Sequence, residues 1–248
     1  MAAERSRGQR KQDDTRRVRD LLRSEVLSSD YVHFGSLPTE DYLQQDLEVS
    51  RAVVRDALSL LSDEGVVVRR QRLGTFPNGH RFRSDIAESG GVRQPTQGGI
   101  WAGNMHPQLL AWEYVPAAPP IAHALGLPER AQVLQFDYIL WFEGVQLGYA
   151  TNYIAESHAK LLDASMFKID LYRMFKDVGI DVGESKLIIE AVQADEMDAE
   201  LLGIDAGEPL TVMEQIAYDV GEIPFDFAVI RSIPRRIAAF SRVRHSRP

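Results

Sequence analysis

Two arginines four residues apart, Arg51 and Arg55, are the side chains of this sequence best suited to a chemical task. They fall in a run whose apolar residues repeat at helical spacing, so both guanidinium groups lie on one outer face of a helix. A guanidinium offers a planar fork of donors that matches the edge of guanine and the oxygens of phosphate. The neighbouring Ala52 and Ser59 are small, so bases can approach. The pattern predicts a helix that reads the major groove of DNA.

Short elements on either side must position this helix. It is expected to begin at the cap Ser50 and to end before Gly65. Thr39 is expected to cap a shorter helix just before it, with Tyr42 and Leu43 on the buried side. Two helices joined by a tight turn in this way form a helix-turn-helix.

A basic hairpin is expected after the reading helix. Residues 66–76 combine a valine run with Gly74 near a turn, which predicts two paired strands. Arg69, Arg70 and Arg72 give the tip three positive charges that suit phosphate and narrow-groove contacts. Before these elements we expect a helix over 14–27.

The chain is expected to start with a disordered basic tail over 1–12. The alternative for this tail is an arm that touches phosphate. A DNA-binding domain over 13–79 follows, and residues 80–100, rich in glycine and polar residues, indicate a linker. A second domain is expected over 101–245.

Charge divides the chain in the same way. Residues 1–83 hold 15 lysines and arginines against 13 acidic residues, whereas the rest holds 13 against 23. The asymmetry fits a DNA-facing head on an acidic body. The absence of cysteine excludes disulfides and fits a cytoplasmic protein. We expect neither a secretory signal nor a membrane span, and no metal or other cofactor, because His80 and His106 have no ligand-spaced partners.

Residues 37–76 resemble the winged helix-turn-helix of the GntR family of bacterial transcription regulators. The resemblance is carried by Leu37-Pro38-Thr39-Glu40, Val49-Ser50-Arg51, Val54-Arg55-Asp56-Ala57-Leu58, Leu61, Glu64-Gly65 and Gly74-Thr75-Phe76. It implies that the arginines of the reading helix contact DNA. The expected DNA-contacting set is Thr39, Ser50, Arg51, Ala52, Val53, Arg55, Arg69, Arg70, Arg72, Gly74 and Thr75.

Three departures from the family pattern suggest an unusual operator. Asp41 stands where the family commonly has an arginine that touches DNA, and Ala52 and Val53 replace a polar pair. Arg72 and Leu73 stand where the hairpin tip usually has glycine and a basic residue. We expect Val53 to pack against a thymine methyl instead.

The second domain contains an internal repeat. Leu125-Gly126-Leu127 returns 77 positions later as Leu202-Gly203-Ile204, and Gly144 returns at the same offset as Gly221. Each copy indicates a helix end, a strand, a hairpin turn and a second strand; the alternative is a coincidence between two common patterns. With two further strands and several short helices, this predicts an α+β domain: an antiparallel sheet with helices on one side.

This arrangement resembles the effector-binding domain of the HutC subgroup of GntR regulators, which has a chorismate-lyase-like fold. The helix-end motifs, Tyr153, Glu190 with Ala194, and Arg231 carry the resemblance. It implies a small-molecule effector that changes the affinity for DNA. The expected effector-binding set is Tyr138, Tyr149, Tyr153, Glu190, Phe227 and Arg231.

The effector is expected to be less charged than a sugar phosphate. Members that bind sugar phosphates carry an Arg-x-Arg pair where this chain has Tyr138 and Leu140. A buried phosphate would lack its usual counter-charge there. The alternatives are a site that has decayed, aromatic residues that only fill the core, and a Glu190–Arg231 pair that is purely structural.

Together these patterns predict a sequence-specific DNA-binding regulator, a homodimeric repressor released by its effector. One alternative is a ligand-independent repressor whose second domain only dimerises. A lyase-like enzyme is disfavoured, because the sequence shows no nucleophile with a base, no metal set and no catalytic pair of carboxylates.

Overall fold

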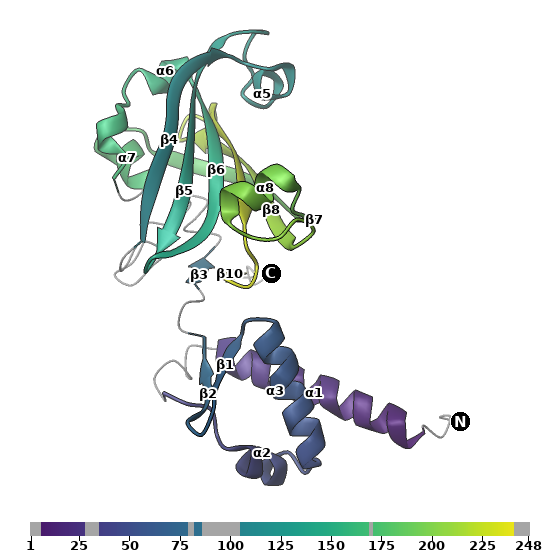
Figure 1. Cartoon of the computed structure of the whole chain (residues 1–248). Helices are drawn as coiled ribbons and strands as arrows, with labels where there is room; N and C mark the ends of the chain where they lie inside the picture. Colours follow the sequence, from purple (N-terminus) through teal and green to yellow (C-terminus); the bar gives the residue numbers. More distant parts are fainter. Residues whose placement is uncertain (1–5, 28–34, 79–81, 86–104, 169–170, 241–248) are drawn as a thin grey trace, which may run out of the picture. The chain divides into compact units, whose positions relative to one another are not determined.

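The computed structural model describes residues 6–27, 35–78, 82–85, 105–168 and 171–240. The chain divides into two compact units, one up to Arg81 and one from Phe82 (Figure 1). No helix in the described ranges is long and apolar enough to cross a membrane.

The first unit is a winged helix-turn-helix. Its elements are α1 (Arg7–Leu27), α2 (Glu40–Asp46), α3 (Arg51–Asp63), and a hairpin of β1 (Val67–Arg70) and β2 (Gly74–Pro77). The three helices and β1 share one core, in which Leu22, Val54 and Leu61 are buried. Apolar residues at i and i+4 on α1 and i, i+3 and i+4 on α3 place these side chains on facing stripes. The predicted helices and hairpin are confirmed.

Helix α1 begins seven residues earlier than expected. The backbone N–H of Ser6 donates to Oε1 of Gln9 at 3.0 Å, and the N–H of Gln9 donates to Oγ of Ser6 at 3.3 Å. This reciprocal pair is a capping box, which fixes a helix start by satisfying two otherwise unpaired donors. The prediction of a disordered tail over 1–12 is therefore wrong from Arg7 onward.

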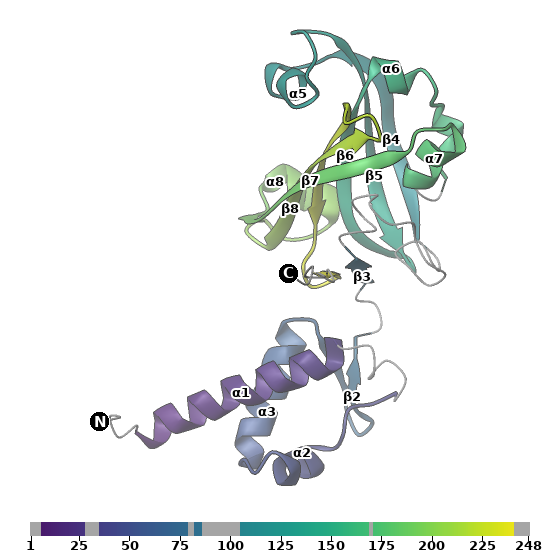
Figure 2. The same ribbon diagram turned by 180° about the vertical axis from the view of Figure 1, so that it is seen from behind.

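The second unit is built on one six-stranded antiparallel sheet with the order β4-β5-β6-β9-β8-β7 (Figure 2). Its strands are β4 (Met105–Pro116), β5 (Gln132–Phe142), β6 (Val145–Ala155), β7 (Val182–Gln193), β8 (Pro209–Asp219) and β9 (Pro224–Ser232). Its short helices are α5 (Pro119–Ala124), α6 (Glu156–Ala159), η2 (Ala164–Met166), α7 (Leu171–Asp177) and α8 (Glu196–Leu202).

The sheet order confirms the repeat. Helix α5 with the hairpin β5–β6 matches α8 with the hairpin β8–β9, and the two copies meet where β6 pairs with β9. The helix-end glycines Gly126 and Gly203 both have a φ of 61°, a left-handed conformation that glycine adopts without strain.

Helices cover both faces of the sheet, which corrects the expectation of one covered face. Side chains of α6, of α7 and of the turns beside them pack against Phe136, Ala150 and Ile154 on one face. Helices α5 and α8 pack on the other face, against Tyr153 and Tyr149 respectively. Because side chains alternate along a strand, a central strand such as β6 can bury both of its sides.

A buried polar pair lies under α6 and α7. Asp226 is fully buried, and its two carboxylate oxygens lie 2.9 and 3.1 Å from the side-chain amide nitrogen of Asn152. Burial raises the pKa of Asp226 to about 7, and the hydrogen bond from Asn152 opposes this rise. The Oδ1 of Asn152 is buried without a hydrogen-bond donor. Burial therefore favours the neutral, protonated form of the Asp226 carboxyl group.

Part of the expected linker over 80–100 is a strand. Residues Phe82–Asp85 (β3) pair in parallel with Ile237–Phe240 (β10) in the second unit. The linker prediction is therefore wrong for these residues. Local sequence could not reveal this strand, because its pairing partner lies over 150 positions away. Residues 86–100 lie outside the described ranges.

Candidate nucleic-acid interface and effector site

Side-chain caps fix both helices of the helix-turn-helix. The Oγ1 of Thr39 accepts from the backbone N–H of Tyr42 at 3.2 Å, and the Oγ of Ser50 accepts from that of Val53 at 3.4 Å. Such caps satisfy donors that the first helical turn leaves unpaired. Both caps are where the sequence predicted them, and they set the start of α3.

The arginines of α3 lie on its outer face as expected. Arg51, Ala52 and Arg55 are all exposed. Within the described residues, the guanidinium of Arg51 has two acidic neighbours on α2, Glu40 at 3.8 Å and Asp41 at 4.0 Å. The guanidinium of Arg51 therefore lies over the N-terminal turn of α2, in an exposed ion pair that solvent screens.

The hairpin presents a second group of basic side chains. Arg69 donates to Glu40 at 2.6 Å, which ties β1 to the start of α2. The guanidinium of Arg70 lies 5.2 Å from the ring centroid of Phe76, at cation–π distance. Arg72 at the tip is exposed, with a φ of 64°. Phosphate oxygens can reach these guanidinium groups from outside.

Two expected contact residues are buried instead. Val53 is 3% exposed in the core of the first unit, so its side chain cannot pack against a thymine methyl. Thr75 is 8% exposed, and its carbonyl accepts from the backbone N–H of Leu37 at 2.8 Å. The prediction for Tyr42 is wrong in the opposite sense: its side chain was expected to be buried but is 56% exposed. Periodicity alone could not tell a core valine from a groove-facing one at the start of α3.

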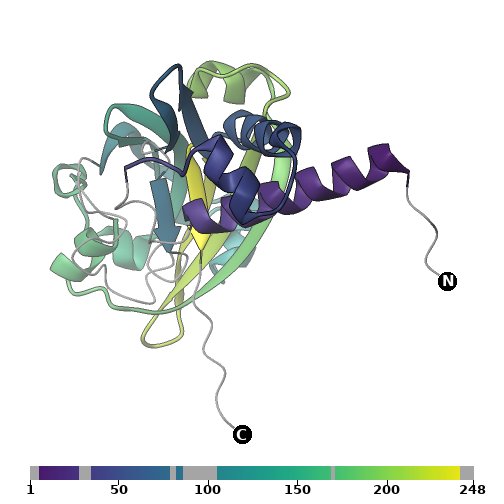
Figure 3. The same ribbon diagram turned by 90° about the horizontal axis from the view of Figure 1, so that it is seen from below.

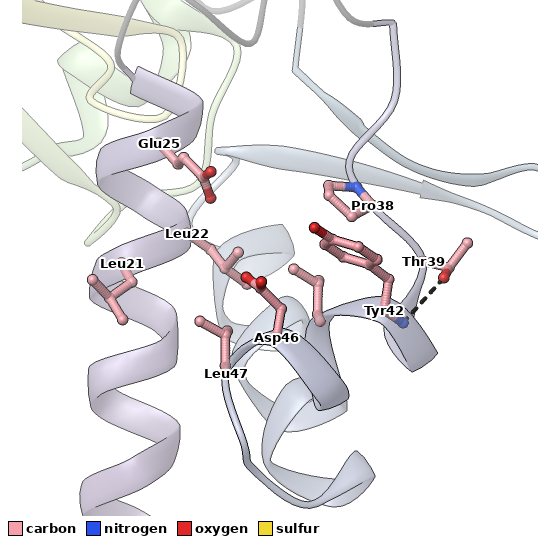
Figure 4. A pocket seen from close by; sticks show the side chains of 9 residues that line it. Leu21, Leu22, Glu25, Pro38, Thr39, Tyr42, Asp46 and Leu47 are labelled. Atoms are coloured by element: carbon pink, nitrogen blue, oxygen red, sulfur yellow. Dashed lines mark hydrogen bonds between the residues drawn. The ribbon is translucent and has the colours of Figure 1, made fainter.

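A pocket of about 430 Å³ lies between α1 and α2 in the first unit (Figure 4). Leucines from both helices line it, and the carboxylates of Glu25 and Asp46 add negative charge. Such a lining repels phosphate, so we do not assign this pocket to the DNA interface. It accounts for the exposure of Tyr42, which lies along its side.

In the second unit, the structure brings five of the six expected effector residues to one face of the sheet. Tyr149 on β6 pairs with Arg231 on β9, Arg231 with Val212 on β8, and Val212 with Glu190 on β7. Directly paired residues share a face. Tyr153 and its partner Phe227 lie on that face too, with ring centroids 6.3 Å apart.

Tyr138 lies on the opposite face, which corrects its place in the expected set. It pairs with Ala150, the neighbour of Tyr149, and is 6% exposed. Its ring packs edge-on against Phe167, with centroids 4.8 Å apart. Tyr138 therefore fits the alternative in which an aromatic residue of the expected set belongs to the core.

A polar cluster near α8 joins two of the remaining residues. The hydroxyl of Tyr149 donates to Asp198 at 2.7 Å, and Nε of Arg231 lies 3.6 Å from the same carboxylate. Burial, together with the hydrogen bond to Asp198, raises the pKa of Tyr149 to about 12. The Nε of Arg231 is buried without a hydrogen-bond acceptor. Glu190 is exposed, so the alternative of a buried Glu190–Arg231 pair is wrong, and Arg231 lies beside Asp198 instead.

No sequence pattern indicated the acidic residues on this face. Asp198 lies on α8 and reaches Tyr149 only because α8 packs on β6. Asp137 on β5 accepts from Oγ1 of Thr151 at 2.6 Å, and its charge adds to burial in raising the pKa of Tyr153. Their roles depend on strand register and helix docking, which local patterns do not encode. In the described part of the chain, no three His, Asp or Glu residues gather as metal ligands do.

A capped helix that carries exposed arginines, a basic wing and a separate two-faced sheet unit together define a DNA-binding regulator with a second, ligand-binding type of domain. The profile of the bacterial regulatory proteins of the gntR family matches residues 14–76, and that of the UTRA domain matches residues 103–237. The chain belongs to the GntR family of transcription regulators, with a UTRA domain as its second unit. It is a regulator and not a lyase.

Known relatives resemble the chain over most of its length. The transcriptional repressor PhnF of Mycolicibacterium smegmatis is 28% identical over 190 residues, which are 76% of each chain. A probable fructoselysine utilization operon repressor of Escherichia coli is 24% identical over 84% of this chain and 85% of its own. The crystal structure of PhnF matches the fold with a TM-score of 0.61, at 23% identity over 93% of this chain and all of PhnF. That of YydK from Bacillus subtilis matches with a TM-score of 0.59, at 18% identity over 93% and 99%.

Proposed function

We propose that this regulator is a repressor that binds a near-palindromic operator as a homodimer and is released by a small-molecule effector. The exposed pair Arg51 and Arg55 on the capped helix α3 carries the proposal. Repression is the role named for PhnF and for the fructoselysine relative.

In the proposed complex, Arg51 and Arg55 donate to base edges, most favourably the O6 and N7 of guanine. Arg69, Arg70 and Arg72 bind phosphates or the adjacent minor groove. DNA must first displace Glu40 and Asp41 from Arg51. Ala52 leaves room for a base beside the two guanidinium groups.

The DNA assignment is tested by replacing the two arginines. We expect Arg51→Ala and Arg55→Ala each to weaken operator binding by about 1–3 kcal/mol and to relax specificity at one base pair. The operator is first selected from a random duplex pool with the wild-type protein, and affinities are measured by fluorescence anisotropy at one salt concentration. Arg16→Ala on α1, where the side chain is exposed and pairs with Asp13, is the matched control. Unchanged operator affinity in both α3 variants refutes the assignment.

We place the effector site on the sheet face that carries Tyr149, Tyr153, Phe227 and Arg231. The orphaned Nε–H of Arg231 supports this site, because an oxygen of the effector is the acceptor that it lacks. Asp137 and Asp198 on the same face oppose a second negative charge. The proposed effector is therefore neutral or cationic, with hydroxyl or carbonyl oxygens and an apolar side that packs against the aromatic rings.

Effector binding is coupled to DNA binding by a free energy of typically about 1–3 kcal/mol. The polar cluster at Asp198 joins α8 to β6 and β9. An effector that draws Arg231 away from Asp198 changes the packing of α8 against the sheet. The altered unit in turn changes the spacing or mobility of the DNA-binding units in the dimer.

A thermal-shift screen tests the effector proposal. Neutral polyols, sugars and amino compounds are compared with sugar phosphates, and a binder at 100 times its Kd adds about 2.7 kcal/mol to stability. We expect stabilisation by a member of the first group, lost in Arg231→Gln and kept in Arg235→Gln. If only sugar phosphates stabilise the protein, the charge argument is wrong. No stabilisation by any compound favours a ligand-independent repressor.

The proposed dimer packs through β7, an edge strand of the sheet. Ile188, Ile189 and Val192 on this strand are 47%, 46% and 38% exposed. An exposed edge strand with apolar side chains on both faces offers backbone groups and apolar surface to a second copy.

A further inference from the structure

We propose that the first two turns of α1, residues 7–13, form an additional phosphate-binding surface that lengthens the DNA footprint of the first unit. This segment precedes the part of the chain that matches the GntR profile, which begins at residue 14. The inference rests on the DNA-binding function and adds a contact element to it.

The basic side chains of this segment are held on an ordered helix. The capping box of Ser6 and Gln9 fixes the helix start. Arg7 and Arg10 are exposed, and neither has an ion-pair partner among the residues that the structure describes. Residues 7–12 include no acidic residue. Positive charge therefore faces solvent on a rigid element, where it can bind an anionic partner with little loss of conformational freedom.

Two ion pairs show that α1 runs beside α3 in the same direction. Lys11 pairs with Asp56 at 2.7 Å, and Arg19 lies 3.8 Å from Glu64. Each pair joins residues 45 positions apart, so eight residues along α1 correspond to eight residues along α3, about 12 Å on each helix. The start of α1 therefore lies toward the start of α3, the end that carries Arg51. Figure 1 shows both helix starts toward the same side of the unit.

Helix α1 also extends past the helix-turn-helix. Figure 3 shows it, in purple, projecting beyond the dark-blue helices of its own unit. Arg7 lies about 6 Å along the helix before Lys11. A helix that enters the major groove is flanked by phosphates on both walls of a groove about 12 Å wide. Arg7 and Arg10 thus contact phosphates of the DNA backbone beyond the bases that α3 reads. Such contacts carry no sequence information.

The test is the salt dependence of binding to a mixed-sequence duplex of about 30 base pairs. Each phosphate contact contributes about 0.9 to the slope of log K against log salt concentration. We expect Arg7→Gln with Arg10→Gln to reduce that slope by about 1.8 and to weaken operator and mixed-sequence binding by the same factor. Arg7→Lys with Arg10→Lys keeps the slope, because a point charge suffices.

The matched control is Arg16→Gln with Arg17→Gln, which removes the same charge from the same helix farther from the start of α3. Circular dichroism checks that every variant keeps its helix content. Equal slopes for the Arg7/Arg10 variant and the wild type, or equal losses in both double variants, overturn the inference. The Arg51 and Arg55 variants test the operator assignment separately, so a failure here leaves that result intact.

Discussion

In the proposed complex, DNA competes for Arg51 with the contacts that this residue makes in the free protein. In the free chain its guanidinium has Glu40 and Asp41 as neighbours, and Glu40 also holds Arg69. Asp41 stands where an arginine is common in the family, so α2 contributes negative charge to a surface that must accept phosphate. In the proposed complex, weak exposed ion pairs of Arg51 are exchanged for contacts with DNA. This exchange favours operators that offer Arg51 a strong acceptor such as guanine.

Asp226 is a residue through which pH can act on the stability of the second unit. Its pKa is raised from 3.8 to about 7 by burial. Between these values the unfolded chain has released this proton and the folded chain has kept it. The contribution of Asp226 to stability is therefore fully present below about pH 4 and is lost as the pH rises through 7.

We expect Asp226→Asn to flatten the dependence of the free energy of unfolding on pH between 4 and 7, because an amide does not ionise in this range. Above pH 7 the variant should be more stable than the wild type, and each 1 kcal/mol gained in the free energy of unfolding should raise Tm by about 2–4 °C. Denaturant titrations at several pH values measure this. The control Asp163→Asn replaces a carboxylate whose pKa is lowered, so it should not flatten the curve. A variant with the same pH profile as the wild type would show that Asp226 is ionised in the fold.

At the scale of elements, the pairing of β6 with β9 joins the two repeats. Gly148 on β6 pairs with Ser232, and a Cβ at this position would lie 2.1 Å from the carbonyl oxygen of Arg231. Only glycine lets the two backbones approach this closely. The same contact sets Tyr149 beside Arg231, so the repeat interface positions the proposed effector site.

We expect Gly148→Ala to destabilise the second unit by about 1–3 kcal/mol, because β9 must move away from β6. Calorimetry should show a lower Tm for this unit, and the stabilisation by an effector should fall with it. Gly8→Ala is the control, since its Cβ meets nothing closer than Oγ of Ser6 at 4.0 Å. An unchanged Tm in Gly148→Ala would contradict the close packing of the two repeats.

At the scale of the whole molecule, one chain supplies one DNA-binding unit, and a near-palindromic operator needs two. The edge strand β7 is the surface that we propose for the dimer. Its exposed isoleucines Ile188 and Ile189 point to opposite faces, as neighbours on a strand do.

We expect Ile188→Lys with Ile189→Lys to convert the protein to a monomer, because two buried charges at the interface lack partners. Light scattering coupled to size-exclusion chromatography measures the mass. Val220→Lys is the control: this residue is 74% exposed, on the turn between β8 and β9. A double variant that keeps the dimer mass would place the interface elsewhere.

The sequence by itself determined the elements whose signals are local. The caps Thr39 and Ser50, the spacing of Arg51 and Arg55, and the repeated helix-end glycines all act between residues a few positions apart. These signals sufficed for both units, for the hairpins and for the family. A local signal was also present at Ser6 and Gln9, where the capping box predicts the early start of α1.

Only the tertiary structure decided which side chains meet. Tyr138 and Tyr149 are both aromatic strand residues, but the register pairs Tyr138 with Ala150 and so places the two rings on opposite faces. Asp198 reaches Tyr149 because α8 docks on β6, and β3 finds β10 across most of the chain. Side chains along a strand alternate between the two faces of the sheet. A register shift of one residue would therefore move the core side chains to the face of the proposed effector site, and the site residues into the core. That choice depends on packing between distant segments, which no local pattern contains.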